Sequence, residues 1–214
     1  MYIPTHNLET DRSRILKLMR EHPFATLISS DPGTAAYEPF VSHFPLLASE
    51  SSSCGGAIRI EGHMSRQNPQ WRHFASGAPA LAIFHGPHAY ITPTWYEEDD
   101  VPTWNYAVVH ARGIARIIDD APRMLKILAA VVNRFEGAHS PPENRWKFWL
   151  PEDLAKPEDL LASIVGFEIE VTAIEAKFKL SQNRSGEDRR RVIAGLKARG
   201  DDESLGIARW MEFG

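Results

Sequence analysis

The sequence predicts a mainly β protein with flanking helices, an α+β fold, from three observations. Residues 58–61 alternate isoleucine with charged residues, the period of two that is typical of a half-buried strand. Residues 164–177 repeat this alternation over a longer run. Residues 186–199 and 201–213 have the pattern of amphipathic helices, so a C-terminal helical extension is expected after the last strand.

The bulk properties fit a single soluble domain. The chain has 214 residues, of which 43% are hydrophobic and 24% are charged, with a net charge of −4. We expect one domain over 1–214, with its core at about 24–180 and its C-terminal helices at 185–213. The first residues do not have a signal pattern, and no apolar run is long enough to span a bilayer. One cysteine and no leader predict a reducing, cytoplasmic location without membrane attachment.

The N-terminal third reads as a helix followed by two strands. Thr10 or Asp11 is expected to cap a helix over residues 11–22. A strand over 24–29 and a turn at 31–33 follow. A second strand is predicted over 39–48, with Pro45 marking an edge or a bulge inside it.

The rest of the chain alternates strands, turns and helices. After the strand at 57–61 we predict a polar turn, and then a helix from Asn68 to Ser76. The glycine-proline pair in 86–88 predicts a turn between two strands. A helix capped by Asp119 or Asp120 is expected after the next strand. The further predicted elements are strands at 78–85, 89–92, 107–118 and 164–177, and a helical face formed by Leu125, Leu128, Val132 and Phe135.

The polar turn has the chemistry of a phosphate site. Arg66 supplies a planar fork of donors, and Ser65 and Asn68 supply neutral ones. A helix that begins here would add free backbone N–H groups. The same residues also fit an ordinary strand-to-helix turn with a solvated arginine.

Aromatic residues are concentrated just after this region. Trp95, Tyr96, Trp104 and Tyr106 fall within twelve residues. These side chains could stack on a planar ligand or pack in a dimer interface, because both kinds of site are enriched in Trp and Tyr. Asn105 lies between two of them, where its amide fits either a ligand carbonyl or the capping of a turn.

Other reactive side chains lack the neighbours that chemistry requires. His85 and His88 have metal-like spacing, but no carboxylate or cysteine cluster accompanies them, so no metal is expected. Cys54 lies in a Ser/Gly loop without a basic neighbour and is expected to be inert. No residue pair indicates a general acid or base, so the catalytic residues and any enzymatic activity stay open.

The helix at 186–199 has a basic side. The basic residues in 189–199 fit contacts to DNA phosphates, which give affinity without sequence recognition. Acidic residues at its start and basic residues at its end also match the helix dipole, so a solvated helix explains the pattern equally well.

Four blocks resemble the PaiB family of FMN-binding negative transcriptional regulators. The blocks are GHMSRQNPQW, FHGPHAYITPTWY, VPTWNY and KFKLSQNR, in the order of the family and spread over nearly the whole chain. This family resembles the split β-barrel flavoproteins, which include pyridoxamine phosphate oxidases and flavin reductases. The resemblance implies a six-stranded split barrel, a homodimer and FMN at the dimer interface.

The resemblance also implies a set of cofactor-binding residues. Arg66 would hold the FMN phosphate with Ser65 and Asn68, and a strand along the flavin ring would carry Ser42 and His43. The remaining candidates are His63, Thr92, Trp104, Asn105, Lys177 and Gln182. The expected function is a flavin-dependent or flavin-sensing negative transcriptional regulator. The alternative is an FMN-dependent oxidoreductase without a role on DNA.

Overall fold

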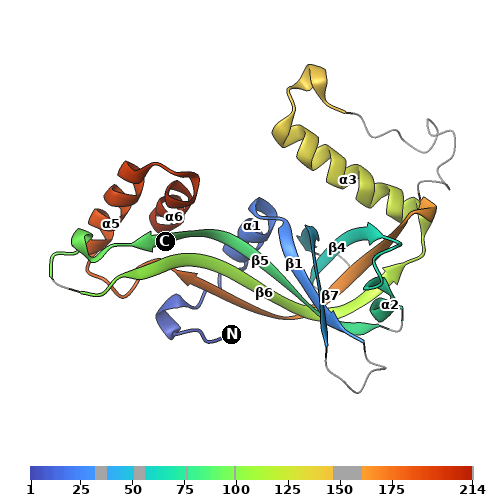
Figure 1. Ribbon diagram of the computed structural model, residues 1–214, viewed down its shortest axis with the longest axis horizontal. Helices are drawn as coiled ribbons and strands as arrows, with labels where there is room; N and C mark the ends of the chain where they lie inside the picture. Colours follow the sequence, from blue (N-terminus) through green and yellow to red (C-terminus); the bar gives the residue numbers. More distant parts are fainter. Residues whose placement is uncertain (32–37, 51–55, 76, 99, 147–160, 214) are drawn as a thin grey trace. The chain divides into compact units, whose positions relative to one another are not determined.

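The computed structural model describes residues 1–31, 38–50, 56–75, 77–98, 100–146 and 161–213 (Figure 1). The predicted turn at 31–33 lies mostly outside this part of the chain, and Cys54 lies wholly outside it. The contacts divide the chain into two compact units, which are described separately. Unit 1 comprises residues 1–22, 83–110 and 174–214, and unit 2 comprises residues 23–82 and 111–173.

A seven-stranded sheet runs through the fold and confirms the mainly β class. Its hydrogen-bonded order is β2-β1-β5-β6-β7-β4-β3. The strands are β1 (Phe24–Ser30), β2 (Pro39–Pro45), β3 (Leu47–Glu50), β4 (Ile58–Ser65), β5 (Ala78–Ile91), β6 (Thr103–Ile118) and β7 (Ile164–Lys179). Strand β1 pairs antiparallel with β2, and β4 pairs antiparallel with both β3 and β7.

The predicted strand at 39–48 is two strands, β2 and β3, on either side of Leu46. The sheet has seven strands, whereas the family resemblance implied six. Pro45 has no N–H to continue the ladder. Leu46 leaves the strand, becomes fully buried, and donates its N–H to the carbonyl oxygen of Pro23 at 2.8 Å. The chain therefore passes through one residue from β2, at one end of the sheet order, to β3, at the other end.

The predicted turn at 86–88 is wrong, because β5 continues through it. Gly86 and Pro87 are both buried, so the alternation of buried and exposed residues shifts by one position, as in a β-bulge. A Cβ on Gly86 would lie 2.9 Å from the carbonyl oxygen of Ala107 and 2.9 Å from the side chain of Leu18. Glycine here permits a close approach between neighbouring elements and does not make a turn.

Helices cover parts of both units. They are α1 (Arg12–Glu21), α2 (Trp71–Phe74), α3 (Ala121–His139), α5 (Gly186–Arg199) and α6 (Asp202–Glu212), with short 3₁₀ turns η1 (Thr5–Asn7), η2 (Pro93–Trp95) and η3 (Pro142–Asn144). Asp11 and Asp120 cap α1 and α3 as predicted. On α3, Leu125 and Leu128 are buried as expected, but Val132 and Phe135 are only partly buried. The predicted helix from Asn68 to Ser76 is reduced to the four residues of α2.

The two units have separate aromatic centres. In unit 2, the ring of Phe167 on β7 contacts the rings of Phe44 and Phe74, at centroid distances of 5.8 and 5.4 Å. In unit 1, Phe178 of β7 meets Trp210 of α6 edge to face at 5.2 Å. These rings are largely desolvated, so they contribute strongly to each core.

Candidate functional site

The turn that follows β4 in unit 2 is closed by its own hydrogen bonds. The backbone N–H of Asn68 donates to the Ser65 carbonyl at 2.9 Å, and that of Gln67 donates to the Ser65 hydroxyl at 3.2 Å. The Asn68 side-chain oxygen accepts from the N–H of Gln70 at 3.0 Å. Asn68 therefore closes a turn and does not cap a helix, and these N–H groups are already used.

Two further candidates lie on the neighbouring strand β2, on opposite faces. The Asn68 amide donates to the hydroxyl of Ser42 at 2.9 Å, so Ser42 belongs to the turn. His43 faces the other way, as alternation along a strand requires, and its Nδ1 lies 3.1 Å from the Thr26 hydroxyl. The structure thus brings Ser42 to the turn but not His43.

Arg66 has an exposed side chain that reaches the start of β7. Its Nε donates to the carbonyl of Ala162 at 2.8 Å, and its Nη2 donates to that of Ile164 at 2.9 Å. Its backbone N–H also donates to the Ser163 carbonyl at 2.9 Å. The two side-chain bonds use two of the five N–H donors of a guanidinium. The others have no partner among the described residues, so this group can still bind an anion.

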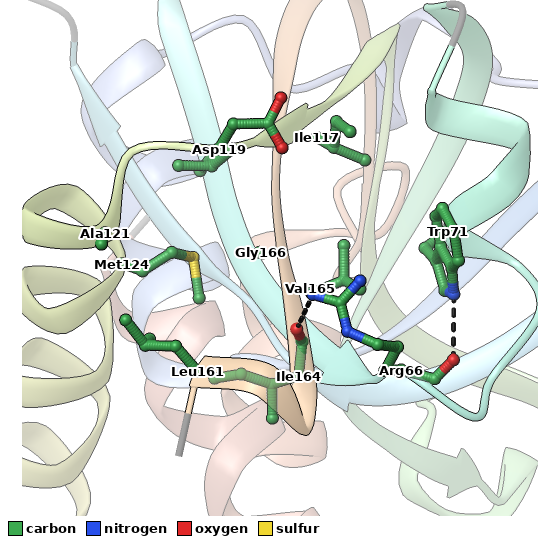
Figure 2. Close-up of a pocket in the computed structure, with 11 residues that line it drawn as sticks. Arg66, Trp71, Ile117, Asp119, Ala121, Met124, Leu161, Ile164, Val165 and Gly166 are labelled. Atoms are coloured by element: carbon green, nitrogen blue, oxygen red, sulfur yellow. Dashed lines mark hydrogen bonds between the residues drawn. The ribbon is translucent and has the colours of Figure 1, made fainter. Parts of the chain in front are cut away.

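The guanidinium lines a pocket of about 160 Å³ (Figure 2). Trp71 forms one wall, and its indole N–H donates to the Arg66 carbonyl at 3.0 Å. Asp119 and Met124 reach the pocket from the approach to α3 and from its first turns. The remaining lining residues are Ile117, Ile118, Ala121, Leu161, Ile164, Val165 and Gly166. Arg66 and Asp119 are thus the charged residues among those that line the pocket.

His63 lies near this region without being part of the pocket. It pairs with Gly166 across β4 and β7. Burial lowers the pKa of the His63 imidazole below its ordinary value, because the charged form loses its hydration. His63 is therefore a neutral ring at physiological pH.

A buried polar cluster behind the turn was not predicted from the sequence. Gln70 is fully buried, and its amide nitrogen lies 3.1 Å from the Ser29 hydroxyl and 3.2 Å from the Phe40 carbonyl. The Ser29 hydroxyl also lies 2.9 Å from Nδ1 of His73. This cluster fixes the turn against β1 and β2. Trp71 was also missed as a site residue, although its place directly after the polar block is a usable signal.

The five candidates in unit 1 have different surroundings. Thr92 caps η2 by accepting from the N–H of Thr94 at 3.4 Å. Asn105 is fully buried, and its amide donates to the Ser181 hydroxyl at 2.9 Å, which favours a structural role. Gln182 uses its side-chain oxygen to accept the N–H of Leu180 at 2.7 Å, a local turn contact.

Trp104 and Lys177 are the other two candidates in unit 1. The indole of Trp104 is 52% exposed, and Lys177 is 9% exposed with its ammonium beside the rings of Tyr2 and Tyr106. Their contact with a flavin stays a prediction.

The basic residues of α5 all have partners within unit 1. Arg189 donates to the carbonyls of Leu180 and Met211 at 2.8 and 3.0 Å. Arg190 and Arg191 pair with Glu187. The remaining pairs are Lys197 with Glu212, and Arg199 with the Tyr90 carbonyl. Each of the five basic side chains of α5 thus has a partner within unit 1.

Within the described ranges, no three His, Cys, Asp or Glu side chains are placed to hold a metal ion together. None of the helices in the part of the chain described here has the length and apolar character that crossing a bilayer requires.

Comparison with known proteins identifies the family. Residues 1–173 match the family model described as "Putative FMN-binding domain". The chain is 34% identical over 212 residues to the protease synthase and sporulation protein PAI 2 of Bacillus subtilis, covering 99% of this chain and 97% of that one.

Two solved structures share the fold at low sequence identity. The FAD and heme binding protein of Mycobacterium smegmatis has a TM-score of 0.58 and 17% identity, covering 91% of this chain and 80% of that one. The flavocytochrome Anf3 of Azotobacter vinelandii has a TM-score of 0.58 and 14% identity, covering 86% and 73%. With the family match and the near full-length relative, they lead to one conclusion: the chain belongs to the PaiB-type family of FMN-binding domains, with a fold of the split-barrel flavoprotein class.

Proposed function

We propose that the protein binds FMN and that Arg66 holds the phosphate of the cofactor. The observation that carries this proposal is the exposed Arg66 guanidinium, which lines the pocket and keeps N–H donors that have no partner in the described part of the chain. Its bonds to Ala162 and Ile164 fix the plane of the group, so little side-chain entropy is lost when a phosphate binds. The Ser65 hydroxyl is the next available donor in the turn.

The pocket fits the phosphate end of FMN but not the whole cofactor. Its volume of about 160 Å³ is below the roughly 300–1,000 Å³ that is typical of pockets for drug-sized ligands. Trp71 supplies an apolar wall, whereas the carboxylate of Asp119 opposes a bound anion. The isoalloxazine ring must therefore be covered by other groups. When bound, the flavin would supply the electron-transfer chemistry that the side chains lack.

We propose that a second copy of the chain provides part of this cover. The outer face of β1 and β2 exposes apolar side chains, with Phe24 65% and Val41 46% exposed. His43 lies on that face between them in the β1–β2 register. A homodimer through this face would bury these side chains beside the strand that carries Ser42. Light scattering of a Val41→Lys variant should then give the molar mass of a monomer. If the variant still forms dimers as stable as those of the wild type, the dimer does not form through this face.

The proposed biological role is a flavin-sensing negative transcriptional regulator located in the cytoplasm. The family resemblance supports it, but the internal pairing of the α5 cations gives no support to direct DNA contact through residues 189–199. Regulation would then depend on FMN occupancy or on a partner protein. Direct contact would appear as promoter binding that weakens steeply with salt. An FMN-dependent oxidoreductase is the alternative, and turnover of NADH or NADPH by the loaded protein would favour it.

The FMN proposal is tested by titrating the stripped protein with FMN and with riboflavin, which lacks the phosphate. We expect binding of FMN at about micromolar Kd, near −8 kcal/mol, and riboflavin at least tenfold weaker. Arg66→Ala should lose this preference for FMN. Arg72→Ala is the matched control. The guanidinium carbons of Arg66 and Arg72 lie 6.0 and 5.7 Å from the Trp71 ring centroid, but Arg72 does not line the pocket.

The comparison within each variant separates binding from folding. Arg66→Ala also breaks two hydrogen bonds to the start of β7, so circular dichroism and a thermal melt must accompany it. If Arg66→Ala is folded and still prefers FMN to riboflavin as strongly as the wild type, the phosphate assignment is refuted.

A further inference from the structure

One face of unit 1 carries a row of aromatic rings that ends beside a lysine. The rings of Tyr90 on β5 and Trp104 on β6 meet edge to face, with centroids 5.9 Å apart, and the ring of His88 lies 6.0 Å from Trp104. Tyr106 is two residues from Trp104, so both point to the same side of β6. The ammonium of Lys177 on β7 lies 5.2 Å from the Tyr106 ring centroid.

Lys179 extends this row, because it lies two residues beyond Lys177 on the same strand. The set will be called the aromatic–lysine face. It comprises His88, Tyr90, Trp104, Tyr106, Lys177 and Lys179.

Among the described residues, no carboxylate pairs with either lysine of this face, whereas Glu203 contacts its His88, with 3.3 Å between Oε2 and Nδ1. Lys177 is 9% exposed and contacts the rings of Tyr106 and Tyr2, but no carboxylate pairs with it among the described residues. Lys179 bonds to the neutral hydroxyl of Thr103. Glu175, two residues before Lys177, instead accepts a hydrogen bond from the N-terminal ammonium at 2.7 Å. Keeping two ammonium groups together without a counter-charge is costly in a desolvated place.

The neighbouring Arg184 shows how the chain balances a cation elsewhere. Its guanidinium pairs with Asp100. The pKa of Lys179 is lowered by burial first, and then by the positive charges of Lys177 and Arg184. A bound anion would relieve the same repulsion.

We propose that the aromatic–lysine face of unit 1 is a nucleotide-binding site, built from other residues than the Arg66 turn. The heteroaromatic ring of the nucleotide stacks on Trp104, whose indole is 52% exposed. The phosphate bonds to Lys177 and Lys179 and supplies the missing negative charge. A phosphate monoester carries about −1.5 to −2 charges at pH 7, which matches two lysines. A carboxylate would neutralise only one.

The test uses calorimetric titration of the full chain with AMP, GMP, CMP and UMP, and with adenosine and inorganic phosphate as the separate halves of AMP. At least one nucleotide should bind at or below about 1 mM, with its nucleoside and inorganic phosphate at least tenfold weaker. Lys177→Met and Lys179→Met should each weaken the nucleotide at least tenfold, because methionine keeps the apolar stem and removes the charge. Trp104→Leu should weaken nucleotide and nucleoside alike.

Two controls keep this proposal distinct from FMN binding. Lys197→Met removes a lysine of unit 1 that already pairs with Glu212, and it should change nucleotide affinity less than twofold. Arg66→Ala should lose the preference for FMN but keep nucleotide binding. The proposal is overturned if no nucleotide binds, if adenosine binds as tightly as AMP, if folded Lys177→Met is unaffected, or if Arg66→Ala abolishes nucleotide binding.

Discussion

Removing the Arg123 side chain should detach the first turn of α3 from the sheet of unit 2. Nη2 of Arg123 bonds to Glu61 at 2.6 Å and to Glu168 at 2.5 Å, and the three side chains are only 31, 22 and 23% exposed. The next residue of α3, Met124, lines the Arg66 pocket. Arg123→Met keeps the apolar stem and deletes both ion pairs.

The expected cost follows from the partial burial of these groups. Hydrogen bonds to charged groups contribute about 1.5–3 kcal/mol each when buried, and exposed ion pairs contribute about 0.2–1 kcal/mol. Two pairs of intermediate exposure should therefore be worth about 2–3 kcal/mol in the free energy of unfolding at pH 7. Arg59→Met is the matched control, because Arg59 loses a single, longer contact to Glu168 at 3.4 Å, worth about 0.2–1 kcal/mol.

Urea denaturation at several pH values tests the ionic origin of this effect. Arg123 lowers the pKa of Glu168 in the folded state, chiefly through their hydrogen bond. The resulting stability is present above the unfolded pKa of a glutamate, about 4.3, and is lost as the pH falls through the lower folded pKa. The difference between wild type and Arg123→Met should therefore shrink below about pH 4. A difference that is equally large at pH 7 and pH 3 would refute the reasoning.

Three other substitutions have measurable outcomes. Gly166→Ala would place a Cβ 1.7 Å from the Met124 sulfur, so thermal melting should show a loss of about 1–3 kcal/mol that Met124→Ala partly restores. No loss would mean that α3 shifts freely. Asp119→Asn removes the carboxylate that opposes a phosphate in the pocket and should tighten FMN binding severalfold in a titration; weaker binding would show that the carboxylate is needed. Since burial depresses the folded pKa of His63, the wild type should lose stability as the pH falls below about 6.5. Urea denaturation of His63→Gln should show a smaller loss of stability over this pH range. If the free energy of unfolding falls equally steeply with pH in the variant and in the wild type, another group causes the loss.

Local signals in the sequence predicted most of the elements but not their partners. The caps at Asp11 and Asp120 and the alternation in β4 and β7 depend on residues close in sequence, and these were predicted correctly. The continuation of β5 through Gly86 was missed, because a Gly-Pro pair marks a turn unless another element packs closely against it.

The candidate site shows the same limit. The position of Arg66 at the end of a strand was predictable, but its bonds to Ala162 and Ile164 join residues 96 and 98 positions apart. Asn105 is buried through contacts to Ser181 and Met211, which lie 76 and 106 positions away, so its neighbours in the sequence did not reveal its burial.

The passage from β2 to β3 through Leu46 has a consequence for the nascent chain. The hairpin β1–β2 and the hairpin β3–β4 can form as soon as the first 65 residues are made. Strand β4 can pair with β7 only after β7 has been synthesised, and β7 begins at Ile164, about one hundred residues later. Until it arrives, β4 offers an unpaired edge to other chains. Chains that end before β7 should therefore aggregate through β4, and chaperone dependence should fall once β7 has been synthesised.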